Sequence, residues 1–85
     1  MNQIDQLIRL ANRIGNFFDS LPNREEGLEG VANHIQKFWE PRMRIRMLEF
    51  LAEHPDGKTA NEALNPLTLA AITENKERLT PKSTV

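Results

Sequence analysis

The chain has 85 residues, eleven of them basic and twelve acidic, so its formal charge is −1, and it contains no cysteine. A chain this short forms one small domain with a marginal core. The lack of cysteine excludes disulfides and iron–sulfur ligation through thiolates, and the near-neutral charge argues against general nucleic-acid or membrane-surface binding. The sequence shows no signal-peptide pattern and no apolar run near the ~18 residues of a membrane span, so we expect a cytoplasmic protein.

A helix is predicted over residues 2–20, where apolar residues recur at helical spacing. A stripe and a second ridge beside it make about half of the circumference apolar, wider than the ~100° of an ordinary surface helix. The stripe holds Ile4, Leu7, Ile8, Ala11, Gly15 and Phe18, and the ridge holds Leu10, Ile14, Phe17 and Leu21. Asp5, Arg9 and Arg13 line the other side, where a solvated ladder is expected. Gly15 among apolar positions predicts close approach of another helix.

Two further helices are predicted over residues 24–39 and 41–53. Asn23 is a candidate N-cap of the first of these, because its side chain can accept a hydrogen bond from the open backbone N–H groups. The apolar stripe of that helix holds Leu28, Val31, Ala32, Ile35, Phe38 and Trp39. The broad apolar face of the next helix holds Met43, Met47, Leu48, Phe50 and Leu51. Arg44 projects inside this apolar arc, whereas Arg42 and Arg46 lie off it.

The last predicted helix covers residues 66–79, with Asn65 as its N-cap and Pro66 at its first position. Residues 59–64 are expected to form a loop or short turn, and residues 80–85 a flexible tail. Together these elements predict an all-α fold, a small bundle of three to four short helices that forms a single domain over residues 1–79.

The sharpest local feature is the run FWEPRMR at residues 38–44, which contains the only tryptophan. Pro41 disfavours helical backbone at Glu40 and can itself open a helix, so the run reads as a helix-to-helix corner. Aromatic residues and arginine are enriched at protein interfaces, which makes Trp39, Arg42 and Arg44 candidate partner-binding residues. Trp39 also fits a core position, and Arg44 also fits a core arginine whose stem packs while its head reaches water.

No catalytic, cofactor-binding or metal-binding constellation stands out. His34 and His54 are 20 residues apart, and neither belongs to a metal-binding signature, so both are expected at the margin of the core. Ser20 and Ser83 have no partners that would suggest a nucleophile. No glycine-rich phosphate loop follows a strand. We therefore expect a protein that is not an enzyme and holds no cofactor or metal.

Three ordered blocks carry a resemblance to a known family. They are LANRIG at residues 10–15 followed by Phe17 and Phe18, GVANHI at residues 30–35, and the corner at residues 38–44. The chain resembles the delta subunit of bacterial NAD-dependent, molybdenum- or tungsten-containing formate dehydrogenases over roughly residues 4–54. Glu40 stands where the family usually has aspartate, and Asn65-Pro66-Leu67 replaces a serine-proline-leucine helix start.

The resemblance implies a non-catalytic accessory subunit that supports assembly or stability of the enzyme. The molybdopterin, iron–sulfur clusters and flavin would belong to the other formate dehydrogenase subunits. The implied partner is above all the cofactor-bearing alpha subunit. On this basis the candidate partner-binding residues are Trp39, Pro41, Arg42 and Arg44 at the corner, with Leu10 and Phe17 on the first helix. The wide apolar band of that helix also predicts a weak homodimer of the isolated chain.

One alternative function belongs to another class. A small helical regulatory or nucleic-acid-binding module could use Arg42, Arg44 and Arg46 on phosphates, with Lys37 as a fourth contact. Four phosphate contacts would give a salt slope of roughly −3.6. The net charge of −1 and the interleaved glutamates count against this alternative.

Overall fold

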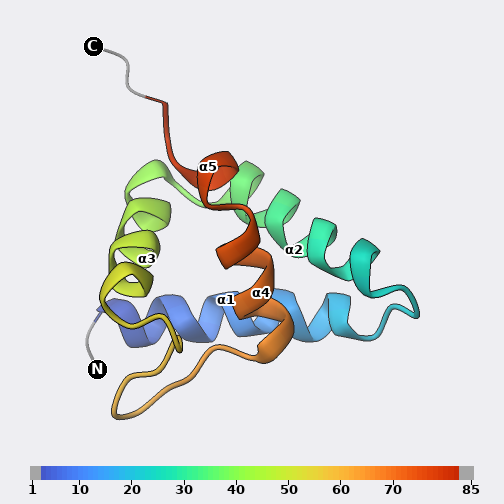
Figure 1. The fold of residues 1–85 in the computed structure, drawn as a ribbon, viewed down its shortest axis with the longest axis horizontal. Helices are drawn as coiled ribbons and strands as arrows, with labels where there is room; N and C mark the ends of the chain where they lie inside the picture. The colour runs from blue at the N-terminus through green and yellow to red at the C-terminus, as the bar shows by residue number, and fades with distance from the viewer. Residues whose placement is uncertain (1–2, 83–85) are drawn as a thin grey trace.

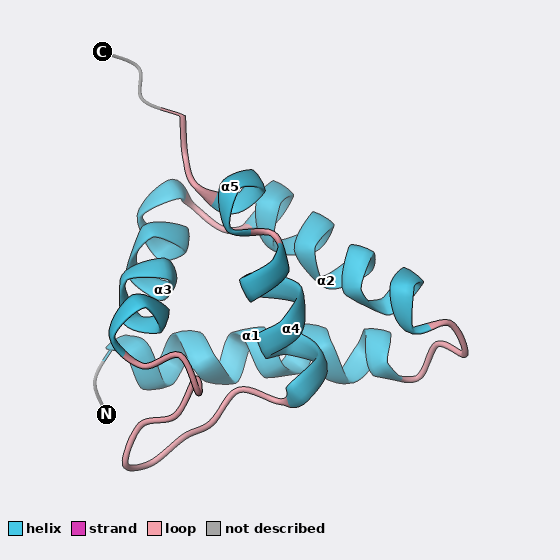
Figure 2. Cartoon of the chain, in the orientation of Figure 1, coloured by secondary structure: helices cyan, strands magenta, loops and turns pink. Residues whose placement is uncertain are grey.

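The computed structural model describes residues 3–82, and its regular elements are helices (Figures 1 and 2). Within that range they are α1 (Gln3–Asp19), α2 (Arg24–Phe38), α3 (Pro41–Glu53), α4 (Pro66–Glu74) and the single-turn α5 (Lys76–Leu79). The all-α prediction is confirmed. The first and last residues of α1, α2 and α3 each lie within one residue of the predicted positions. Residues 83–85 of the predicted tail lie outside the described residues.

The helices α1 and α2 form a hairpin (Figure 1). Asn23 is the N-cap of α2 as predicted, because its Oδ1 accepts hydrogen bonds from the N–H groups of Glu25 at 2.8 Å and Glu26 at 3.2 Å. The two helices approach closely at Gly30, where an added Cβ would overlap the ring of Phe18. A residue without a side chain therefore allows the hairpin to close.

A two-residue corner joins α2 to α3. Glu40 is the N-cap of α3, and Pro41 occupies the start of the helix, where its missing N–H leaves no bond unmade. Trp39, the C-cap of α2, has an extended backbone with φ −83° and ψ 138°. The corner sets α3 across the N-terminal half of α1, so that α1, α2 and α3 surround α4 on three sides (Figure 1).

The helix α4 packs against both members of the hairpin. It meets α1 at Gly15, where an added Cβ would overlap Oγ1 of the fully buried Thr68. The close helix approach predicted from Gly15 is thus present. The predicted single helix over residues 66–79 is divided at Asn75, whose φ of −122° and ψ of 29° are not helical. The short α5 then turns back over α2.

The connection from α3 to α4 is a long loop that lies along α1 (Figure 2). It turns at Gly57, whose φ is +70°, and closes through an isolated antiparallel bridge between Lys58 and Ala63. The side chains that hold it come from the polar side of α1. They are Asp5, which bonds Thr59 and Asn61; Arg9, which pairs with Glu62; Asn12, which bonds Ala63 and Asn65; and Asn16, which bonds Asn65.

This loop corrects one expectation about α1. Asp5 and Arg9 were expected in a solvated ladder, yet Asp5 is only 1% exposed. Arg9 is exposed as expected, and it pairs with Glu62 at 2.7 Å. Polar residues at helical spacing on this side serve as attachment points for a loop more than fifty residues further along the chain. Arg13, the third member of the ladder, is exposed as expected.

The core lies between α4 and the three helices around it. Its buried members are Ile4, Leu7, Ile8, Ala11, Val31, Ile35, Trp39, Met47, Phe50, Leu51, Leu64, Leu67, Ala71, Ile72 and Leu79. In the range 3–82, no helix has the length and apolar character needed to cross a membrane.

Candidate partner-binding site

The corner between α2 and α3 exposes a different aromatic residue from the one expected. Trp39 is 7% exposed and belongs to the core, whereas its neighbour Phe38 is 71% exposed. The helix ends at Phe38, and the extended backbone at Trp39 takes its side chain out of the helical pattern. Trp39 therefore supports the corner from within, while Phe38 presents the aromatic surface. Phe38 also contacts His34, with ring centroids 4.7 Å apart.

Pro41 and Arg42 lie on the outside of this corner. Pro41 is exposed, and the side chain of Arg42 is 84% exposed. Nε of Arg42 lies 3.5 Å from the Glu40 carboxylate, which is itself largely exposed. A pair of exposed side chains at this separation adds little to stability, so the guanidinium is available to another molecule.

Arg44 lies on the side of α3 opposite to Arg42. Its Nη1 donates a hydrogen bond to the carbonyl oxygen of Leu79 at 3.3 Å. Its Nε is buried and has no hydrogen-bond partner among residues 3–82. The hollow beside it is lined by apolar residues, with Trp39 among them, and is too narrow for a water molecule. Arg44 thus keeps one donor unused inside the protein.

The three alternate arginines are not brought together on one surface. Arg42 is exposed at the corner and Arg44 lies under α5. Arg46 lines a separate cleft of about 340 Å³ with Ile4, His54 and Lys58. A phosphate backbone cannot contact the three side chains from one side, which counts against the nucleic-acid alternative.

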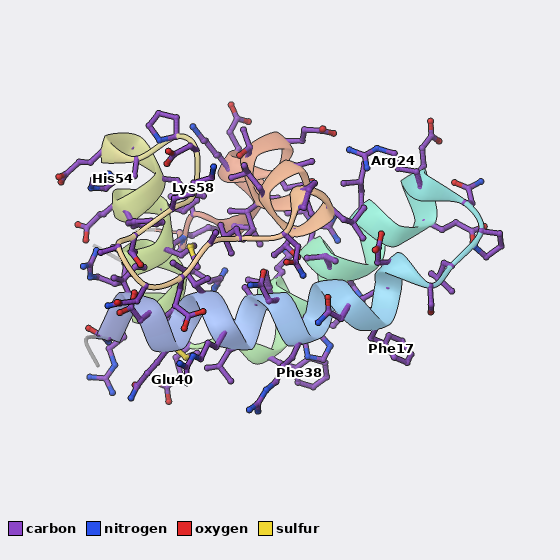
Figure 3. All side chains as sticks on the ribbon, turned by 90° about the horizontal axis from the view of Figure 1, so that it is seen from below. Phe17, Arg24, Phe38, Glu40, His54 and Lys58 are labelled. Carbon is purple, nitrogen blue, oxygen red and sulfur yellow. The ribbon has the colours of Figure 1, made fainter. Side chains whose placement is uncertain are left out.

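Most of the predicted apolar ridge is on the surface, but Ile14 is half-buried against the core, and Leu21 lies just beyond the end of α1. Leu10 is 39% exposed, Phe17 69% and Leu21 37%. Phe17 rests its ring edge-on against Phe18, with centroids 5.0 Å apart. Figure 3 shows Phe17 and Phe38 projecting from the same face of the molecule, on the side away from α4. Two large, solvated aromatic rings from different helices thus share one face.

One ion pair outside the predicted site, between Arg78 and Glu29, joins α5 to α2. Arg78 donates two hydrogen bonds of 2.7 Å to the Glu29 carboxylate and a third to Gln36. The hydrogen bonds from Arg78 hold the pKa of Glu29 below its usual value, against the opposing effect of burial. The two residues are 49 positions apart, and no spacing in the sequence connects them.

Neither histidine takes part in a metal site among the described residues. The ring of His34 lies tilted against Phe38, and that of His54 stacks on Phe50. In residues 3–82, no group of three or more histidine, aspartate or glutamate side chains is placed to hold a metal ion.

Comparison with known proteins identifies a family to which the chain is similar. No curated protein and no solved structure shows significant similarity to the chain. The family described as NADH-dependent formate dehydrogenase delta subunit FdsD matches residues 6–72. The match runs from the first turns of α1 through the corner and the loop into α4, so it extends the resemblance of residues 4–54 over most of the domain. The chain belongs to the NADH-dependent formate dehydrogenase delta subunit family.

Proposed function

We propose that this delta subunit is a non-catalytic accessory subunit that supports assembly or stability of formate dehydrogenase by docking on the cofactor-bearing alpha subunit. The observation that carries the proposal is the pair Phe17 and Phe38, which are 69% and 71% exposed on one face. Solvated aromatic rings are costly to a protein that works alone, and aromatic residues frequently anchor interfaces. Membership of the family supplies the enzyme to which the partner belongs.

The docking surface is defined by residues from both sides of the hairpin. Leu10 and Phe17 contribute from α1, and Phe38, Pro41 and Arg42 contribute from the corner. The apolar residues would be desolvated at the centre of the contact, and Arg42 would bind a carboxylate at its rim. Trp39 acts behind this surface by fixing the direction in which the corner faces.

Deletion of the gene tests the accessory role. Strains without the delta subunit should yield less assembled formate dehydrogenase and less formate-dependent NADH production. Catalysis per assembled enzyme, measured against molybdenum or tungsten content, should be preserved. Full assembly and full activity without the delta subunit would contradict the proposal. A loss of turnover in fully assembled enzyme would instead indicate a direct catalytic part.

Complementation with variants tests the docking surface. A copy carrying Phe17→Ser and Phe38→Ser should fail to restore assembly, because both anchors become polar. A copy carrying Ile45→Ser should restore it, since Ile45 is a 43% exposed apolar residue on a different helix.

The purified wild-type chain should show no flavin or cluster absorption and no stoichiometric metal.

A further inference from the structure

The single turn α5 covers one side of the corner. Leu79 is 1% exposed and lines the same hollow as Trp39, Arg44 and Met47. The carbonyl oxygen of Leu79 accepts the hydrogen bond from Arg44. An apolar side chain and an oxygen acceptor from α5 therefore occupy the space directly beside the arginine.

The Leu79 carbonyl is a poor hydrogen-bond partner for the Arg44 guanidinium. A guanidinium can offer two parallel N–H groups to a carboxylate, but the neutral Leu79 carbonyl accepts from Nη1 alone, at the long distance of 3.3 Å. Nε is left without a hydrogen bond in the described part of the chain, and no water can enter the hollow. Arg44 also forms no salt bridge with any residue between 3 and 82. A carboxylate on the Nε edge of the guanidinium could accept from Nε and Nη2 together, the pair whose N–H groups are parallel, and would balance the charge.

Apart from the buried Leu79 side chain, the attachment of α5 is light. The element has four residues, too few to be a stable helix by itself. It follows the non-helical Asn75, and Arg78 holds it to a Glu29 carboxylate that is 64% exposed. The family match ends at residue 72, so α5 lies beyond the matched region while Trp39 and Arg44 lie inside it.

We propose that α5 is an internal clasp over a carboxylate-binding site at Arg44, and that docking of the partner subunit displaces it. This inference rests on the proposed docking function, and it requires the partner to extend past the corner from the face of Phe17 and Phe38 to the side that α5 covers. The occupant is a segment of the alpha subunit that carries an aspartate or glutamate next to an apolar side chain. The apolar side chain takes the place of Leu79, and the carboxylate accepts hydrogen bonds from Nε and Nη2 of Arg44 together. The clasp keeps the site closed in the free subunit.

Amide hydrogen exchange in the complete complex tests the clasp directly. The N–H groups of Leu79 and Thr80 bond to the carbonyls of Asn75 and Lys76. Both bonds lie within the turn itself, and a four-residue turn released from the core does not stay helical, so both amides should exchange at least tenfold faster in the complex than in the free chain. Docking without displacement would leave their exchange unchanged or slower, and either result would overturn the clasp.

Two matched variants test it independently through affinity. Arg78→Gln removes the ion pair to Glu29 and should strengthen binding about three- to fivefold, because less has to be broken before docking. Lys76→Gln makes the same charge change on the same turn, without a side-chain bond in the structure, and should leave affinity unchanged. Equal or weaker binding by folded Arg78→Gln would show that α5 is only part of the core.

Substitution of Arg44 tests whether displacement of α5 and binding of the carboxylate are coupled. Arg44→Gln should weaken binding about tenfold or more and abolish the gain from Arg78→Gln. Arg44→Lys should restore little, because lysine offers a point charge and not a fork. If Phe17 and Phe38 variants weaken binding but Arg44 and Arg78 variants do not, docking stands and the clasp fails. If no complex forms with the wild-type chain, the proposed function fails with it.

Discussion

The contact between Gly15 and Thr68 sets how closely α1 and α4 pack. A Cβ on Gly15 would overlap Thr68 Oγ1 and lie 3.2 Å from Thr68 Cβ. Thr68 is fully buried, and its hydroxyl has no hydrogen-bond partner within residues 3–82. The hydroxyl therefore fills space at this contact and adds no compensating bond, so a larger residue on α1 must push the helices apart.

Gly15→Ala should lower the free energy of unfolding by about 1–3 kcal/mol, because overpacking outweighs the better helix propensity of alanine. Urea denaturation followed by circular dichroism measures this. In a Thr68→Ala background the same change should cost much less, since the overlapping hydroxyl is gone. An equal loss in both backgrounds would mean that the contact does not limit the packing.

The ion pair between Glu29 and Arg78 has a defined pH dependence. The folded pKa of Glu29 is held below the unfolded value, chiefly by the hydrogen bonds from Arg78. The pair therefore adds stability at pH values above the unfolded pKa, and this contribution disappears as the pH falls through the folded pKa. Arg78→Gln should move the pKa of Glu29 up toward its usual value in a side-chain NMR titration. Lys76→Gln should leave that pKa where it is in the wild type.

The direction of single side chains was the hardest feature to predict. Helical spacing placed Trp39 and Phe38 on one stripe, but the helix ends between them and only Trp39 turns into the core. Arg44 was predicted inside an apolar arc, and it is there. The sequence alone could not identify Leu79 as its neighbour, because that contact joins residues 35 positions apart.

The long loop between α3 and α4 is held chiefly by polar groups. Thr59 donates a hydrogen bond to the Asp5 carboxylate at 2.7 Å, and Asn61 donates another at 3.3 Å. Oγ1 of Thr59 in turn accepts from the N–H groups of Asn61 and Glu62. Thr59 and Glu62 have the Thr-x-x-Glu spacing of a capping box, but here this spacing stabilises a turn that is not followed by a helix.

Asp5→Ala should lower the free energy of unfolding by about 1–3 kcal/mol, because it removes the buried carboxylate that accepts hydrogen bonds from Thr59 and Asn61. Asp19→Ala, at the exposed other end of α1, should change it by no more than about 0.5 kcal/mol. Amides of residues 58–63 should exchange faster in Asp5→Ala. Unchanged stability would mean that water replaces the carboxylate without loss.

Helix starts were predictable because local chemistry fixes them. The helix α2 begins after Asn23, whose side chain caps it. The helices α3 and α4 begin at Pro41 and Pro66, where the N–H that proline lacks would have no partner in the helix. The break at Asn75 was not predictable, since asparagine costs a helix little and apolar residues continue on both sides. Its cause is tertiary: Leu79 reaches the core and Arg78 reaches Glu29 only if the chain turns there.

At the scale of the molecule, the distribution of exposed apolar groups is uneven. Phe17 and Phe38 lie on the face away from α4 (Figure 3), whereas the Arg78 ion pair joins α5 to Glu29 of α2. The face with the two rings is the part of the fold that its own core does not use. Its exposure motivates both the proposed docking and the weak self-association of the free chain.

The isolated chain should form a weak homodimer through this face. Sedimentation equilibrium should give a dimer dissociation constant in the range of about 0.1–1 mM, as small solvated apolar contacts allow. Phe17→Ser with Phe38→Ser should abolish the dimer and reduce the binding of a hydrophobic dye. A dimer that persists in this variant would place self-association on another surface.

The central claim is that the face carrying Phe17 and Phe38 docks the delta subunit on the alpha subunit. The most direct measurement is the dissociation constant of the purified delta subunit for the alpha subunit. The double variant Phe17→Ala/Phe38→Ala should weaken binding about thirtyfold or more, since each ring is an anchor. Ile45→Ala should stay within about twofold of the wild type, as a substitution outside the contact does. Wild-type affinity in the double variant, with its helix content intact by circular dichroism, would contradict the account.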